Sequence, residues 1–142
     1  MLLLTREFTI RTSLRNAWEG LATPESWPEW AKHIKRVRCD PPGAVVPTTV
    51  GTLYLAGGIR SSFRMLELNP DRNWVWSGAF LWLRVTYDHV FEALDESETR
   101  IRFTVDVVGF GAGTLGRVFA RIYARNLDKA IPNLIVHLES RA

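Results

Sequence analysis

The order of the periodic segments in this 142-residue chain restricts its fold more than any single motif does. A short strand, Phe8–Thr12, leads into an amphipathic helical segment over residues 13–22, and a run of strand-like segments follows. One long amphipathic helix over residues 114–139 closes the chain. Consecutive strands joined by short turns pair antiparallel, and the buried face of such a sheet needs a covering layer. The order therefore predicts an α+β fold in one domain, residues 1–142, with a curved sheet of about seven strands wrapped on the C-terminal helix.

Two short helices are expected directly after the first strand. Ser13 is a favourable N-cap, and Leu14, Trp18 and Leu21 recur at helical spacing. Thr23 can cap a second short helix that has a proline in its first position and is limited by Pro28.

The strands expected after His33 are separated by turn residues, among them Gly57-Gly58 and Asn69-Pro70-Asp71. Their approximate ranges are 34–40, 50–56, 59–68, 73–81, 83–94 and 98–108. Strict alternation in the last strand puts Ile101, Phe103, Val105 and Val107 on one face. The strand before it puts Val85, Tyr87, His89, Phe91 and Ala93 on one face. We therefore expect one covered face and one solvated face.

The C-terminal helix carries a broad apolar face that is suited to cover this sheet. Its predicted members are Leu115, Val118, Phe119, Ile122, Tyr123, Leu127, Ala130, Ile131, Leu134 and Leu138. Pro132 lies inside the helix and is expected to kink it. The glycines at 109, 111, 113 and 116 loosen the chain before the helix, and they lack the lysine and the βαβ context of a phosphate-binding loop.

Composition and charge exclude several classes of protein. No apolar run approaches the length of a membrane-spanning helix, the N-terminus does not resemble a signal peptide, and the single Cys39 excludes an internal disulfide. The chain is therefore expected in the cytoplasm. Its net charge of +3 comes with acidic residues scattered among the basic ones, so nucleic-acid binding is not favoured. No spacing indicates a metal site or a cofactor.

Several short elements make the chain resemble a known superfamily. They are the segment from Ser13 to Trp18, Trp27-Pro28-Glu29-Trp30, Glu67-Leu68-Asn69-Pro70, and Asn126-Leu127-Asp128-Lys129 in the last helix. Together with the element order they resemble the helix-grip fold of the SRPBCC superfamily, which includes START domains and birch-pollen-allergen proteins. The resemblance is to its polyketide cyclase/dehydrase-type branch and covers essentially the whole chain.

The resemblance implies a deep cavity between the sheet and the C-terminal helix that holds a hydrophobic small molecule such as a lipid, a polyketide or another aromatic. The residues expected to line it are Trp76, Tyr87, His89, Phe91, Phe103, Val105, Phe119, Ile122 and Tyr123. The favoured function is binding or carriage of such a ligand. The alternative is a polyketide cyclase or dehydratase. The branch has no universal catalytic motif, so the resemblance assigns no catalytic residue.

His89 is the one candidate for acid–base catalysis. Strand alternation puts it on the cavity face beside Tyr87, where a neutral-pH titration would suit proton transfer. The simpler alternative is a core histidine bonded to backbone or water. Asp88 points to the opposite face in a regular strand and cannot orient it. Tyr87 or Tyr123 could orient a polar end of the ligand.

Three further questions stay open at this point. Arg64 is at the surface if Phe63 and Met65 face inward, and in the cavity if Leu66 and Leu68 do. The arginines at 117, 121 and 125 recur every four residues and form one stripe, which allows a partner-interaction module as a third function. The oligomeric state, and whether the segment 109–116 gates the cavity, are not fixed by the sequence.

Overall fold

The computed structural model describes residues 1–141 and consists of one sheet, two α-helices and a 3-10 helix. The elements are β1 (Leu2–Ile10), α1 (Leu14–Leu21), the 3-10 helix η1 (Pro24–Glu29), β2 (Ile34–Asp40), β3 (Val50–Leu55), β4 (Ile59–Asn69), β5 (Asn73–Phe80), β6 (Leu83–Asp95), β7 (Glu98–Val108) and α2 (Leu115–Glu139). The fold class predicted from the sequence is confirmed.

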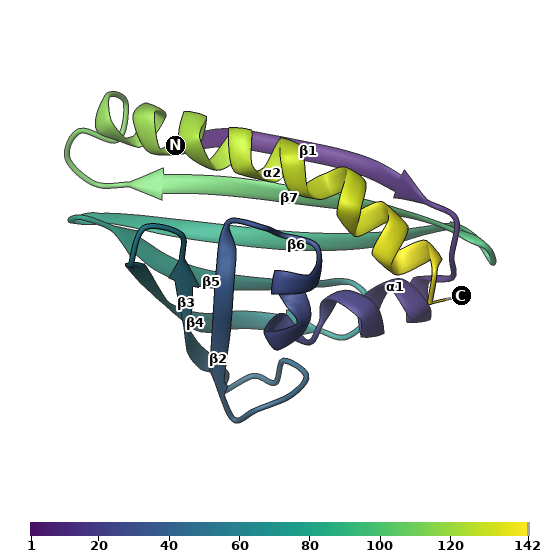
Figure 1. Ribbon diagram of the computed structural model, residues 1–142. Coiled ribbons are helices and arrows are strands. Elements are labelled where there is room, and N and C mark those ends of the chain that lie inside the picture. The colour runs from purple at the N-terminus through teal and green to yellow at the C-terminus, as the bar shows by residue number, and fades with distance from the viewer. Residues whose placement is uncertain (142) are drawn as a thin grey trace.

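The seven strands form a single antiparallel sheet in the order β1-β7-β6-β5-β4-β3-β2. Strands that follow one another in sequence from β2 to β7 are also neighbours in space, and only β1 pairs out of order, with β7. From β3 to β7 the connecting turns are two or three residues long. Irregular registers interrupt the β1–β7, β2–β3, β4–β5 and β6–β7 pairs. Such bulges increase the local twist, so the sheet curves around the elements on its inner face (Figure 1).

The first strand is longer at its beginning than the sequence pattern predicted. It starts at Leu2 rather than Phe8 and ends at Ile10 rather than Thr12, pairing with β7 from Leu2↔Asp106 to Ile10↔Thr99. The partner strand decides these bounds, since β7 offers unpaired backbone groups along its length.

The inner face of the sheet carries the residues that alternation placed there. Across β5, β6 and β7, Trp76 pairs with Tyr87 and Tyr87 with Val105, while Trp74 pairs with His89 and His89 with Phe103. These rows bring side chains from three strands into contact. On the outer face, Asp88 accepts a hydrogen bond from Asn73 Nδ2 at 3.0 Å, as expected for a residue that points away from His89.

Helix α2 lies along β1 and β7 and continues through Pro132 (Figure 1). Small residues let it approach closely: a Cβ on Gly116 would lie 3.1 Å from Leu3 Cδ1. At the β1 edge of the sheet, Arg6 Nε donates a hydrogen bond to the Asp128 carboxylate at 2.7 Å. No helix among residues 1–141 has the length and apolar character needed to span a membrane.

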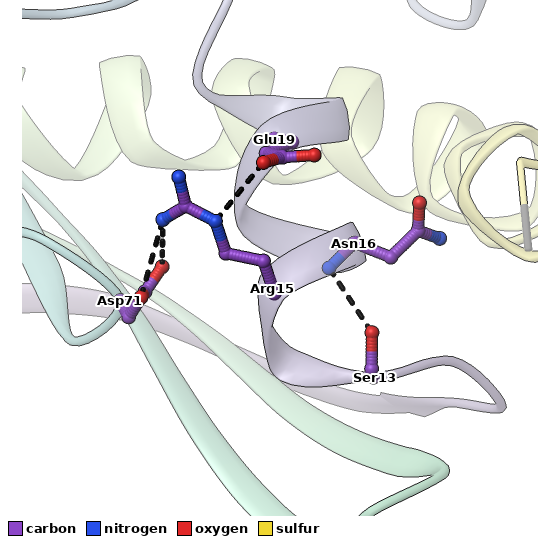
Figure 2. A network of polar contacts seen from close by, with 5 residues as sticks. All are labelled: Ser13, Arg15, Asn16, Glu19 and Asp71. Carbon is purple, nitrogen blue, oxygen red and sulfur yellow. Dashed lines mark hydrogen bonds and ion pairs between the residues drawn. The ribbon is translucent and has the colours of Figure 1, made fainter.

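Helix α1 is fixed at its start and along its exposed side (Figure 2). The Ser13 hydroxyl accepts a hydrogen bond from Asn16 N at 3.2 Å, which is the predicted N-cap. Arg15 donates to Glu19 one turn later at 2.9 Å and to Asp71 in the β4–β5 turn at 3.0 Å. These contacts anchor α1 to the sheet and hold the aromatic side of the helix, Trp18, against the inner face.

Candidate ligand-binding site

The centre of the inner face is filled by aromatic rings that pack on one another. Trp74 stacks on His89 with ring centroids 4.5 Å apart, and its other ring neighbours are Trp18 at 5.3 Å, Phe91 at 5.7 Å and Trp76 at 6.0 Å. Trp27, from η1, approaches Trp76 at 5.4 Å. Of the residues predicted to line a cavity, Trp76, His89, Phe91, Phe103 and Val105 are buried in this layer. They form packed core in the region where the resemblance implied a deep cavity.

His89 is held in the core by the packing of neighbouring aromatic rings and by one hydrogen bond. Its Nδ1 lies 3.2 Å from the Trp74 carbonyl oxygen, and because a carbonyl only accepts, we assign the proton to Nδ1. Burial lowers the pKa of His89 to about 4, although the bond to Trp74 opposes this shift. The ring is therefore neutral near pH 7. This is the arrangement of a backbone-bonded core histidine.

A second set of aromatic side chains lies on the same face and stays half-buried. Phe80 of β5 contacts Phe119 at 5.0 Å, Phe119 contacts Tyr123 at 5.9 Å, and Tyr123 contacts Tyr87 at 5.5 Å. We call these four residues the aromatic wall. Within residues 1–141, no protein group forms a hydrogen bond with either tyrosine hydroxyl in the structure, and burial raises the pKa of both. Both hydroxyls therefore stay protonated and can donate to a bound molecule.

Ile122 does not belong to this face, contrary to the prediction. Its side chain is 57% exposed, and Val118, one turn earlier, is also exposed at 50%. The buried stripe of α2 follows Gly116, Ala120, Leu127, Ala130, Leu134 and Leu138. Apolar residues of α2 also lie outside this stripe, so the prediction from hydrophobicity alone made the buried face of the helix too wide.

A polar cleft of about 310 Å³ opens between α2 and the segment before β2. It is lined by Lys32, His33, Asn126, Lys129, Ala130 and Asn133. Phe119, Tyr123, Asn126 and Ala130 recur every three or four residues, so the cleft continues the side of α2 that bears the aromatic wall. Two lysine ammonium groups and the Asn126 amide suit an anionic or carbonyl group, whereas Asn133 Nδ2 already donates to the Trp30 carbonyl oxygen at 3.3 Å.

Another depression, of about 320 Å³, lies around Arg64, Ser77, Trp82 and Arg84 near the β5–β6 turn. None of the residues predicted to line the site belongs to either depression. The cleft residues were missed because lysine and asparagine at a helix surface look like a solvated face. Their position opposite His33 depends on how α2 crosses the sheet.

Burial and hydrogen bonds settle the placement of the residues that the sequence left undecided. Phe63 and Met65 are buried and Arg64 is exposed, which is the first of the two alternatives. Trp82 is 63% exposed, whereas the aromatic rings of the core are buried. Trp27 donates from Nε1 to the Leu21 carbonyl at 2.9 Å and so joins η1 to α1. In residues 1–141 no group of three or more His, Cys, Asp or Glu side chains is arranged to hold a metal ion.

Solved structures show the same fold over nearly the whole chain. An aromatase/cyclase, Zhui, from a Streptomyces species is 20% identical with a TM-score of 0.74, covering 97% of this chain and 93% of that one. A hypothetical protein from Helicobacter pylori is 15% identical with a TM-score of 0.76, covering 94% and 85%. The di-domain ARO/CYC StfQ of the steffimycin biosynthetic pathway is 16% identical with a TM-score of 0.73, and the match covers 99% of this chain and 52% of that one. At these identities the likeness establishes the fold alone.

No curated protein sequence matches the chain. A family model does match, over residues 1–134, and its description is polyketide cyclase/dehydrase and lipid transport. This match spans the strands, both short helices and most of α2, and it agrees with the resemblance carried by the sequence elements. The chain therefore belongs to the polyketide cyclase/dehydrase and lipid transport family.

Proposed function

We propose that this protein binds a hydrophobic small molecule between the inner face of the sheet and α2, at the aromatic wall. The observation that carries the proposal is the wall itself: a row of four aromatic side chains, each in contact with the next, that keep part of their surface open. Aromatic rings with a few placed polar groups are the usual lining of a ligand site. The family and the aromatase/cyclase neighbours support the same ligand class.

The polar cleft gives the proposed ligand an orientation. Lys32, Lys129 and Asn126 would receive an anionic or carbonyl end, while the apolar body lies along Phe119 and Tyr123. The tyrosine hydroxyls, both protonated, would donate to an oxygen of the same molecule. A flat aromatic acid or a fatty acid meets these requirements. We expect binding to take place in the cytoplasm, as predicted from the sequence.

The first test is titration with 1-anilinonaphthalene-8-sulfonate, a probe with an aromatic body and one anionic group. We expect saturable binding, with roughly tenfold weaker affinity in Tyr123→Ala, because a half-buried ring contributes about 1.4 kcal/mol of contact. Lys129→Gln should also weaken binding. Val136→Ala, on an exposed position of the same helix, is the matched control. Equal affinity in all four proteins would contradict the proposed site.

Native mass spectrometry of protein purified from its own host then identifies the ligand class. A retained apolar molecule that disappears in Tyr123→Ala would support carriage. An apo mass together with no probe binding would count against the proposal.

A cyclase or dehydratase with His89 as acid or base has less support from the site. The ring is enclosed by Trp74, Trp76 and Phe103, and its low pKa makes it a weak base. We therefore propose a packing role for His89, and expect His89→Phe to retain probe affinity. A large loss of affinity without loss of folding would instead favour contact with the ligand.

A further inference from the structure

Large exposed apolar side chains gather at one end of the molecule. This end holds the β3–β4 turn, the β5–β6 turn, the β7–α2 loop and the first turns of α2, at the left in Figure 1. Phe110 is 90% exposed, Leu81 65% and Trp82 63%. Other exposed members at this end are Leu2, Ile59, Val108, Val118 and Ile122. Large apolar side chains exposed together at one end of a protein often mark an interaction site.

The three most exposed apolar side chains at this end, those of Phe110, Leu81 and Trp82, form one unit. The pair Phe80↔Leu83 closes the hairpin over Leu81 and Trp82, and the pair Arg84↔Val108 puts this hairpin beside the end of β7. Trp82 Nε1 donates to the Phe110 carbonyl oxygen at 2.7 Å. We call Leu81, Trp82 and Phe110 the apolar tip.

The hairpin turn of the apolar tip holds a leucine in an unfavourable backbone conformation. Leu81 has φ of 55°, in the left-handed region that favours glycine, asparagine and aspartate. A two-residue turn between β-strands usually contains those polar or small residues. A strained and exposed Leu81 beside an exposed Trp82 indicates that these side chains serve a contact outside the chain.

Several arginines lie at the same end of the molecule as the apolar tip. Exposed arginines at this end are Arg36, Arg60, Arg84, Arg117 and Arg121. None of them forms an ion pair within residues 1–141, whereas Arg6, Arg15 and Arg100 elsewhere do. The stretches 42–66, 72–87 and 107–127 contain no aspartate or glutamate. The depression of about 320 Å³ beside Trp82 is lined by Arg64 and Arg84 together with Ser62 and Ser77.

We propose that this end docks on an anionic membrane surface, with the apolar tip in the interface and the arginines on lipid phosphates. Tryptophan and phenylalanine are favoured at the headgroup boundary, and each arginine near an anionic surface adds to the attraction. A second copy of the chain would bring like charges together, since each face carries unpaired arginines. Nucleic acid would use the arginines and leave the apolar tip in water. This inference does not depend on the proposed ligand site.

The test is sedimentation of the full chain with vesicles of phosphatidylcholine and phosphatidylglycerol, and with vesicles of phosphatidylcholine alone. We expect binding to the mixed vesicles that is much stronger than to the neutral ones. The double variant R117Q/R121Q should bind about thirtyfold more weakly, since two charges are removed. Phe110→Ser should bind roughly tenfold more weakly, because an exposed phenylalanine no longer enters the interface.

Matched controls carry the same chemical changes at other places. R11Q/R72Q removes two exposed arginines at the opposite end of the sheet, and Val136→Ser removes an exposed apolar side chain on α2. Both should bind vesicles like the unchanged protein. All the altered positions are exposed, so circular dichroism and thermal unfolding are expected to stay the same.

Three results would overturn the proposal. The first is equal or absent sedimentation with both vesicles. The second is a concentration-dependent dimer, abolished by Phe110→Ser, without vesicle binding. The third is binding to duplex DNA that R117Q/R121Q weakens and Phe110→Ser leaves unchanged, again without vesicle binding.

Discussion

Replacing Trp74 by alanine is expected to lower the free energy of unfolding by about 3–5 kcal/mol, the usual cost of removing a fully buried large aromatic side chain. Trp74 has no exposed surface and packs on His89, Trp18 and Phe91 at once. Its removal leaves a cavity bordered by rings from β6 and α1. Urea denaturation followed by circular dichroism measures the difference.

Two controls separate packing from other effects. Trp82→Ala removes the same side chain from an exposed turn and should change the free energy of unfolding by less than about 1 kcal/mol. Trp74→Phe keeps a ring in the core and removes Nε1, which is buried and has no hydrogen-bond partner among residues 1–141. Because an unpaired buried donor is itself unfavourable, Trp74→Phe should cost much less than Trp74→Ala. Equal stability of Trp74→Ala and Trp82→Ala would show that the aromatic layer is not the core.

The second large effect is a loss of stability in acid caused by His89. Burial holds its pKa near 4 in the folded protein, below the ordinary value of 6.5 that it regains on unfolding. The unfolded chain therefore binds a proton that the folded chain excludes, and stability present above pH 6.5 is lost as the pH falls toward 4. Between pH 8 and pH 5 we expect a loss of about 2 kcal/mol from this residue.

The measurement is the free energy of unfolding from urea titrations at several values between pH 4.5 and pH 8. In His89→Phe the slope attributed to this residue should disappear, although the loss of the bond to Trp74 lowers stability at pH 8. Burial also lowers the pKa of His33, so a smaller slope of the same sign should remain. Val136→Ala changes an exposed side chain that cannot titrate, so this control should leave the slope in place. A slope unchanged in His89→Phe would mean that His89 is solvated.

The sequence by itself determined the order of elements, their approximate bounds and the inward face of the central strands. These properties depend on local periodicity, caps and turns, and Ser13, Gly57-Gly58 and the alternation from Ile101 to Val107 were sufficient to predict them. Even where the bounds differed, as in β1, the type of element was right. The inward face also followed, because alternation fixes it once one strand is oriented.

Only the tertiary structure decided which inward residues are filled core and which remain open. His89 and Tyr87 alternate identically in sequence, yet Trp74 covers the first and the second stays half-buried at the wall. Ile122 and Tyr123 are neighbours, and the angle at which α2 crosses the sheet exposes one and covers the other. The meeting of Lys32 and His33 with Asn126 likewise depends on that crossing. Periodicity specifies a face, whereas the open space on that face depends on the volumes and positions of side chains far apart in the chain.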